Sequence, residues 1–126
     1  MKAILAAFLL AASPALAADV PSGQPVTLHE VLVDAVESET WLRFRFIAPD
    51  IARAGRAMAY DVAAEDMMHL CTALALPYSD THALAGDMII ISLADRVTEF
   101  GVPAPEATQF FEAFRPVDNT CIWESL

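Results

Sequence analysis

One histidine of this chain has carboxylates nearby, at a spacing that could support acid–base chemistry. His69 follows Glu65 by four residues and Asp66 by three. On a helix these spacings place side chains next to one another, so that a carboxylate could orient a catalytic His69. The same spacing is also typical of a surface ion pair without a catalytic role, and we favour that interpretation.

A metal site or a nucleophilic triad could also be built around the histidines. His69, Cys71 and His82 form a possible His-x-Cys…His metal set, but on a helix Cys71 would point away from His69, and we expect no metal. Ser79, Asp80 and His82 lie in a predicted loop, without the nucleophile elbow or oxyanion glycines of a hydrolase. A small hydrolase using such histidines and carboxylates is therefore only the alternative function, and we expect no cofactor.

The two cysteines, Cys71 and Cys121, are predicted to form a disulfide. No other cysteine is present, and the two stand far apart in the chain. Redox-active pairs usually have only two residues between the cysteines, at the start of a helix. For a loop of about 50 residues, the chain-entropy model predicts about 4 kcal/mol of stabilisation. We therefore interpret this pair as structural.

Two arginines, Arg43 and Arg45, alternate with large apolar residues in the segment 41–47. In a strand this alternation places both guanidinium groups on one face. Such a pair could clamp a carboxylate or a phosphate of a ligand. We favour instead salt bridges to acidic residues of the neighbouring strand, such as Glu30 or Asp34.

Aromatic side chains are concentrated near the C-terminal end. If they are exposed, they offer a surface to a protein or a small ligand, and together with the arginine pair they form our candidate interaction surface. Core packing is the favoured alternative, because a sheet covered by one helix needs bulky residues to fill the space. The aromatic candidates are Phe110, Phe111, Phe114 and Trp123.

The clearest helical pattern runs from about Asp61 to Ala75. Asp61 is a suitable N-cap, and Pro77 is expected to end the helix. Apolar residues recur at three- and four-residue intervals, which predicts a buried stripe from which a cysteine could reach a strand. The stripe consists of Ala63, Met67, Leu70, Cys71 and Leu74.

Segments rich in alternating or β-branched residues predict strands on both sides of this helix. The first two are separated by a short polar break at 37–40 and should form an antiparallel hairpin. Residues 107–115 fit either a helix or the first strand of a hairpin, and we choose the hairpin. The fold class is therefore α+β, a single two-layer domain with a mainly antiparallel sheet and one main helix packed on it. The predicted strands are 26–36, 41–47, 88–93, 97–100, 109–115 and 120–123, of which 88–93 is expected to be central.

The first seventeen residues predict a cleavable signal peptide. They combine a basic start, an apolar run and the small-residue exit Ala15-Leu16-Ala17. The apolar run spans about ten residues, half of what a membrane-spanning helix needs. We predict cleavage between Ala17 and Ala18, an irregular lead-in over 18–25 and one domain over 26–126. The protein should then be periplasmic or secreted and not attached to a membrane.

The chain is strongly acidic, which limits its partners. It has 17 acidic and 7 basic residues, for a net charge of −10, and signal removal would take away Lys2, the only lysine. Such a domain repels nucleic acid phosphates and anionic lipids, so we expect no nucleic acid partner. The charge itself is expected to maintain solubility.

Three segments carry a resemblance to known proteins: Asp-Met-Met-His-Leu-Cys at 66–71, Ile-Ser-Leu-Ala-Asp-Arg-Val-Thr-Glu-Phe-Gly at 91–101, and 109–124 with Gln-Phe-Phe-Glu-Ala-Phe-Arg and Cys-Ile-Trp-Glu. Over most of 20–124 the chain resembles an uncharacterised family of small exported alphaproteobacterial proteins, a domain of unknown function. The resemblance implies no activity. Similar proteins also carry the label acetolactate synthase, which we judge incorrect here. Enzymes of that kind are several-fold longer, cytoplasmic and thiamine-diphosphate dependent, and this sequence has no diphosphate-binding motif.

These patterns favour a small disulfide-linked binding or interaction module without catalytic activity. Its partner, an unknown protein or small ligand, is not encoded in any motif of the sequence.

Overall fold

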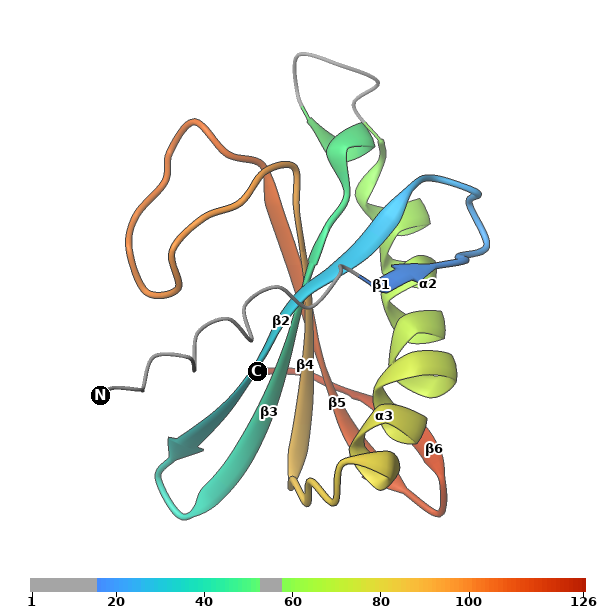
Figure 1. Ribbon diagram of the computed structural model, residues 1–126, viewed down its shortest axis with the longest axis vertical. Helices are drawn as coiled ribbons and strands as arrows, with labels where there is room; N and C mark the ends of the chain where they lie inside the picture. Colours follow the sequence, from blue (N-terminus) through green and yellow to red (C-terminus); the bar gives the residue numbers. More distant parts are fainter. Residues whose placement is uncertain (1–15, 53–57) are drawn as a thin grey trace, which may run out of the picture.

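The computed structural model describes residues 16–52 and 58–126. Within these residues, six strands form one sheet, and a helical run packs against one of its faces (Figure 1). The strands are β1 Leu16–Ala18, β2 Val26–Val36, β3 Glu39–Ile47, β4 Met88–Ala94, β5 Gln109–Val117 and β6 Thr120–Glu124. A short 3-10 turn at Pro49–Ile51 precedes the helical run, which consists of α2 Tyr60–Leu70, a π-helical turn Cys71–Ala75 and α3 Leu76–Thr81.

The strands lie in the sheet in the order of the sequence. Neighbours are antiparallel except β3 and β4, which are parallel because the helical run carries the chain back between them. The β5–β6 turn has Asp118 and Asn119 at φ 50° and 64°, the backbone that suits a two-residue hairpin. The predicted hairpin near the C-terminus is therefore confirmed, and the helical alternative for 107–115 is wrong.

The α+β class is supported, but the simple two-layer arrangement is wrong. The sheet curls around the helical run as a half-barrel (Figure 1). One cause is a bulge in β2, where the pairing with β3 shifts between Leu28 and Glu30 and leaves His29 without a partner. Bulges bend a strand and increase its twist. Central strand β4 is confirmed, since it pairs with β3 on one side and β5 on the other.

Both helix boundaries differ from the prediction. The helix begins at Tyr60 with Ala59 as N-cap, so Asp61 lies in the first turn and does not cap it. Pro77 does not end the helical run, which continues to Thr81. The π-helical turn precedes Pro77 and places it at the start of α3, where a missing backbone N–H removes no hydrogen bond.

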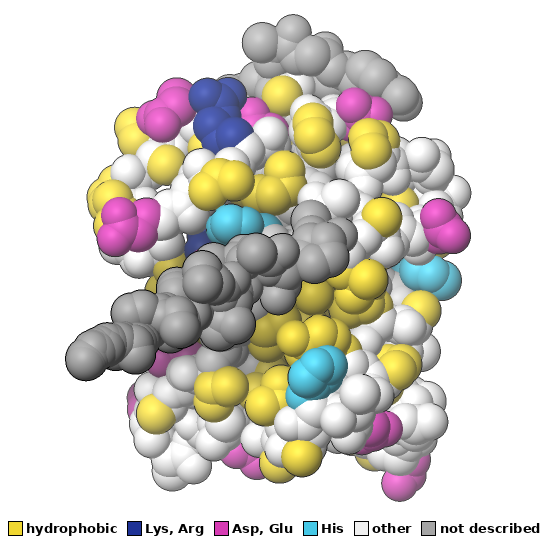
Figure 2. All heavy atoms as spheres, viewed as in Figure 1, with side chains coloured by type: hydrophobic (Ala, Val, Ile, Leu, Met, Phe, Trp, Pro, Cys, Tyr) yellow, Lys and Arg dark blue, Asp and Glu magenta, His cyan; other side chains and the backbone are white. Residues whose placement is uncertain are grey.

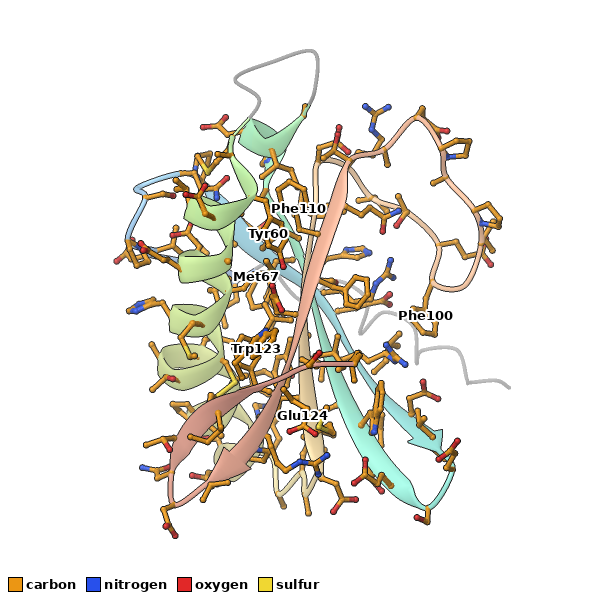
Figure 3. All side chains as sticks on the ribbon, turned by 180° about the vertical axis from the view of Figure 1, so that it is seen from behind. Tyr60, Met67, Phe100, Phe110, Trp123 and Glu124 are labelled. Atoms are coloured by element: carbon orange, nitrogen blue, oxygen red, sulfur yellow. A yellow bond between two sulfur atoms is a disulfide. The ribbon has the colours of Figure 1, made fainter. Side chains whose placement is uncertain are left out.

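The core lies between the helical run and the inner face of the sheet, the face that the helices cover. The predicted helical stripe is buried except for half-buried Leu74. Figure 3 shows Met67 pointing from α2 toward the sheet. Phe44, Phe46 and Phe114 fill the space from the strand side, each almost completely buried.

The predictions for the N-terminal segment fall partly outside the described residues. Residues 1–15 of the predicted signal peptide lie outside them. The predicted cleavage site, Ala17 and Ala18, lies within β1, where the two residues pair with Thr27 and Val26. No helix within residues 16–52 and 58–126 is long and apolar enough to cross a membrane.

Asp66 anchors the lead-in to α2. Residues 19–25 form no helix or strand, and the fully buried carboxylate of Asp66 binds two of them. Its Oδ1 accepts a hydrogen bond from Ser22 N at 3.0 Å, and its Oδ2 accepts from Ser22 Oγ at 2.6 Å and Gln24 Nε2 at 2.8 Å. Asp66 is therefore turned away from His69 and serves the fold.

We expect Asp66→Asn to lower the free energy of unfolding by about 2 kcal/mol. The amide replaces one acceptor oxygen with a donor, which then faces a donor of Ser22 or Gln24. Urea unfolding followed by circular dichroism measures the change. The control is Glu65→Gln, which makes the same chemical change one residue earlier at an exposed position and should stay within about 0.5 kcal/mol. Equal effects of the two substitutions would contradict the anchoring role.

Candidate functional site

The predicted disulfide between Cys71 and Cys121 is confirmed. It joins the π-helical turn to edge strand β6, with a Cα–Cα distance of 6.3 Å. Both cysteines are buried. They therefore connect two elements of the core and do not contribute to a surface site.

The histidines are not brought together. His69 is exposed on α2, and His82 follows the end of α3. His82 lies thirteen positions after His69, which corresponds to roughly 20 Å along a helix axis. Among the described residues, no group of three or more His, Cys, Asp or Glu side chains could hold a metal ion.

Of the candidate triad residues, Ser79 and Asp80 lie on α3 and not in the predicted loop, and His82 follows the end of α3. Ser79 is buried, whereas Asp80 and His82 are exposed. The His82 ring stacks on Tyr78 with centroids 4.0 Å apart, and its Nδ1 donates a hydrogen bond to the Tyr78 carbonyl oxygen at 2.9 Å. These contacts occupy the imidazole that a triad would use as its base.

The four aromatic candidates have different environments. Phe114 is core, only 1% exposed. Phe110 lies between the sheet and α2, with its ring edge-on to Tyr60 at 5.1 Å (Figure 3). Trp123 is 56% exposed on edge strand β6, and its Nε1 donates a hydrogen bond to Glu112 Oε1 at 2.6 Å. Phe111 is 59% exposed on the outer face, the side of the sheet away from the helical run.

The arginine pair lies on the same outer face. In the sheet register Arg45 pairs with Ser92 of β4, and Ser92 pairs with Phe111 of β5. The structure thus brings Arg43, Arg45 and Phe111 to one surface. The other aromatic candidates lie in the core or at the β6 edge.

The salt bridges predicted for the arginines are confirmed. Arg43 Nε donates a hydrogen bond to Asp34 Oδ2 at 2.9 Å, and Arg45 Nη1 binds Glu30 Oε2. Arg45 Nη2 also donates to the backbone oxygen of Thr98 at 3.1 Å and to its Oγ1 at 2.9 Å. Arg45 therefore attaches the loop 95–108 to the outer face.

Residues 97–100, predicted as a strand, belong to this loop instead. The loop lies on the side of the sheet away from α2 (Figure 1, orange). Val97 and Phe100 are 66% and 46% exposed, so the segment has no buried side that would hold it as a strand. Gly101 follows with φ +81°, a left-handed conformation in which a residue with a side chain would be strained.

Asp95 closes the base of the loop. Its backbone N–H and Thr108 C=O form a hydrogen bond of 3.0 Å, and its Oδ1 accepts another from Thr108 N at 3.0 Å. Arg96 Nη2 donates to Asp95 Oδ2 at 2.9 Å. The pKa of Asp95 lies below its usual value, mainly because its carboxylate accepts this hydrogen bond from Arg96. The loop is thus fixed at its base and, through Arg45, along its length.

Phe100 is a site residue that the sequence analysis missed. Its ring centroid lies 5.1 Å from Cζ of Arg43 and 5.5 Å from Cζ of Arg45, within the range of cation–π attraction. Arg43 Cζ also lies 5.3 Å from the ring of Trp41. Figure 3 shows Phe100 on the opposite side of the sheet from Tyr60, Met67 and Phe110.

A groove of about 370 Å³ lies between the outer face and the loop. Its floor consists of the arginine pair and side chains of β4 and β5, and its wall consists of loop residues 99–103. The volume falls at the lower end of the range of small-molecule sites. The floor includes Arg43, Ile90, Ser92 and Phe111, and the wall includes Glu99, Phe100, Val102 and Pro103.

Two charged groups of the groove are incompletely paired. Arg43 uses only Nε in its bond to Asp34, and neither of its Nη atoms has a hydrogen-bond partner among the described residues. The carboxylate of Glu99 likewise forms no hydrogen bond or salt bridge within that part of the chain. The groove therefore offers both a donor and an acceptor to a ligand.

Comparison with known proteins assigns the chain to a family. The family of unknown function DUF6497 matches residues 4–126. The chain belongs to this family. No curated protein and no solved structure matches this DUF6497 chain. The membership agrees with the resemblance drawn from the sequence in that the family has no assigned function.

Acidic side chains of this DUF6497 chain are not gathered in one patch on the face that Figure 2 displays. They lie separately toward the periphery of that face, and hydrophobic side chains gather nearer its middle. The net charge of −10 therefore does not mark a docking site there.

Proposed function

We propose that the chain is a non-catalytic binding module that takes a small ligand in the outer-face groove. The incomplete pairing of Arg43 carries this proposal. Among the described residues neither Nη atom of its guanidinium group has a hydrogen-bond partner, and the group lies near the rings of Trp41 and Phe100 at the floor of the groove. Such a group is a recognition element for a hydrogen-bond acceptor.

Two features support a preformed site. The floor of the groove lies on strands, including central strand β4, and sites on regular elements are held more exactly in place than sites on loops. The loop that forms the wall is bonded to Arg45 and closed by Asp95. Binding would therefore require little ordering of the protein.

The hydrolase alternative receives less support. Its candidate residues His69 and His82 lie far apart, on α2 and after the end of α3, and neither lines the groove. Binding in a secreted or periplasmic compartment is supported by the signal-peptide pattern of residues 1–17 and by the disulfide.

The proposal is tested by titrating the ¹⁵N-labelled protein with a fragment set of small acids, amines, amino acids and neutral aromatics. We expect backbone shifts at Ile90, Ser92 and Phe111 for a subset of fragments. Phe111→Ala should weaken their binding about tenfold, because an apolar side chain of the floor is lost. The control is Val33→Ala, which removes an exposed apolar side chain from the inner face of β2 and should leave binding unchanged.

Three outcomes would contradict the proposal: no fragment shifts groove residues, the shifts gather elsewhere, or Phe111→Ala binds as the native protein does. Turnover of an ester or amide fragment that is lost on changing His69 or His82 would favour the hydrolase.

A further inference from the structure

We infer that the ligand of the groove is a small zwitterion with an apolar body, namely a free α-amino acid with an apolar side chain. This inference rests on the proposed function, since it names the class of ligand for the same groove. It follows from the positions of Arg43 and Glu99, from the charge of the groove and from its apolar walls.

Arg43 is arranged to receive a carboxylate. Asp34 holds its Nε, and the rings of Trp41 and Phe100 lie 5.3 Å and 5.1 Å from its Cζ. The guanidinium plane is thereby fixed while the edge formed by its two Nη atoms has no partner in the described part of the chain. This edge matches two oxygens of one carboxylate, and its fixed orientation reduces the entropy lost on binding.

Glu99 supplies the complementary charge. It belongs to the loop wall of the same groove, and its carboxylate has no counter-ion among residues 16–52 and 58–126. An ammonium group is the cation that a free amino acid would present to it. Glu99 is in the wall and Arg43 is in the floor of the same groove, and we infer that a single ligand contacts both.

The charges around the groove favour a ligand that carries both signs. Arg43 and Arg45 stand against the three carboxylates of Glu30, Asp34 and Glu99, which leaves one negative charge in excess. An organic anion would add to this excess, and an organic cation would leave the Nη edge of Arg43 unpaired. A zwitterion pairs both groups and leaves the local charge unchanged.

Apart from Arg45, Ser92 and Gln109, the rest of the groove is apolar and small. Ile90, Val102, Pro103 and Phe111 line it beside the charged groups. A volume of about 370 Å³ suits a ligand at the small end of the usual range. An apolar side chain of an amino acid would pack against these residues, with Ser92 as a further hydrogen-bonding group at the floor.

The experiment compares three probes by isothermal titration calorimetry: L-phenylalanine, N-acetyl-L-phenylalanine, which lacks the ammonium group, and L-phenylalaninamide, which lacks the carboxylate. We expect L-phenylalanine to bind and each analogue to bind at least about tenfold more weakly, as the loss of one charged hydrogen-bonded contact implies. L-leucine, with its two corresponding analogues, repeats the comparison with an aliphatic body.

Two variants test which residue binds the ammonium group and which binds the carboxylate. The penalty of an analogue is its loss of affinity relative to the parent amino acid. In Glu99→Gln the penalty of the acetylated probe should disappear, and in Arg43→Met the penalty of the amide probe should disappear. Glu106→Gln changes an exposed carboxylate of the same loop outside the groove and should preserve both penalties. Arg43→Lys, which keeps the charge but not the two-nitrogen edge, should show intermediate binding if Arg43→Met disturbs folding.

The outcomes separate this inference from the proposed function. If fragments bind the groove but amino acids do not, or if an analogue binds as tightly as its parent amino acid, the zwitterion inference is wrong and the binding function stands. If neither fragments nor amino acids shift groove residues, both are wrong. Penalties that persist in Glu99→Gln and Arg43→Met would also overturn the assignment of the two residues.

Discussion

Reduction of the Cys71–Cys121 disulfide is expected to lower the free energy of unfolding by about 4 kcal/mol. The crosslink closes a loop of 50 residues, and opening it restores conformational freedom to the unfolded chain. That loss is a large share of the free energy of unfolding of a typical domain, which is roughly 5–15 kcal/mol. The effect should be concentrated at β6, an edge strand that pairs only with β5 among the described strands.

Urea unfolding with and without dithiothreitol measures this effect on the unchanged sequence. The control is the double variant Cys71→Ala/Cys121→Ala, whose stability should not respond to the reductant. Hydrogen exchange should show that the amides of β6 lose protection before those of β4. A reduced protein as stable as the oxidised one would contradict the structural role of the disulfide.

The disulfide illustrates what the sequence could predict. The helical periodicity placed Cys71 on the buried side, and the β-branched run near the C-terminus placed Cys121 on a strand. Both inferences rest on local patterns, and both are confirmed. The π-helical turn that carries Cys71 could not be foreseen, because its residues have no pattern that distinguishes them from an α-helix.

The arginine pair shows a second limit of prediction from the sequence. Alternation in the segment 41–47 predicted that both arginines share a face, and the acidic residues of β2 predicted their partners. The sequence pattern does not reveal that only Nε of Arg43 has a hydrogen-bond partner among the described residues. That depends on Phe100 and on the loop 95–108, whose path is decided by long-range contacts to Arg45 and Thr108. The only local signal was Gly101 with the prolines that follow it.

The curl of the sheet was missed for a similar reason. The strand pattern of 26–36 predicted one continuous strand, and the bulge at His29 is not visible in it. A flat sheet under one helix was therefore the natural expectation. The bulge and the parallel β3–β4 pair arise from how the strands meet, which single-strand periodicity does not contain.

Phe114→Ala is expected to lower the free energy of unfolding by about 4 kcal/mol. Phe114 is 1% exposed and belongs to the main core cluster beneath the helical run. Its removal leaves a cavity that the rigid strands β4 and β6 on either side cannot close. Thermal and urea unfolding both measure the loss.

Phe111→Ala is the matched control, because it makes the same change three residues earlier on the same strand. Phe111 is 59% exposed on the outer face, so the expected loss is less than about 1 kcal/mol. These two phenylalanines could not be distinguished from the sequence, since the pattern of 109–115 allowed either to be core. Similar losses for both would mean that the outer face is also a packed core, which would leave no open groove there for a ligand.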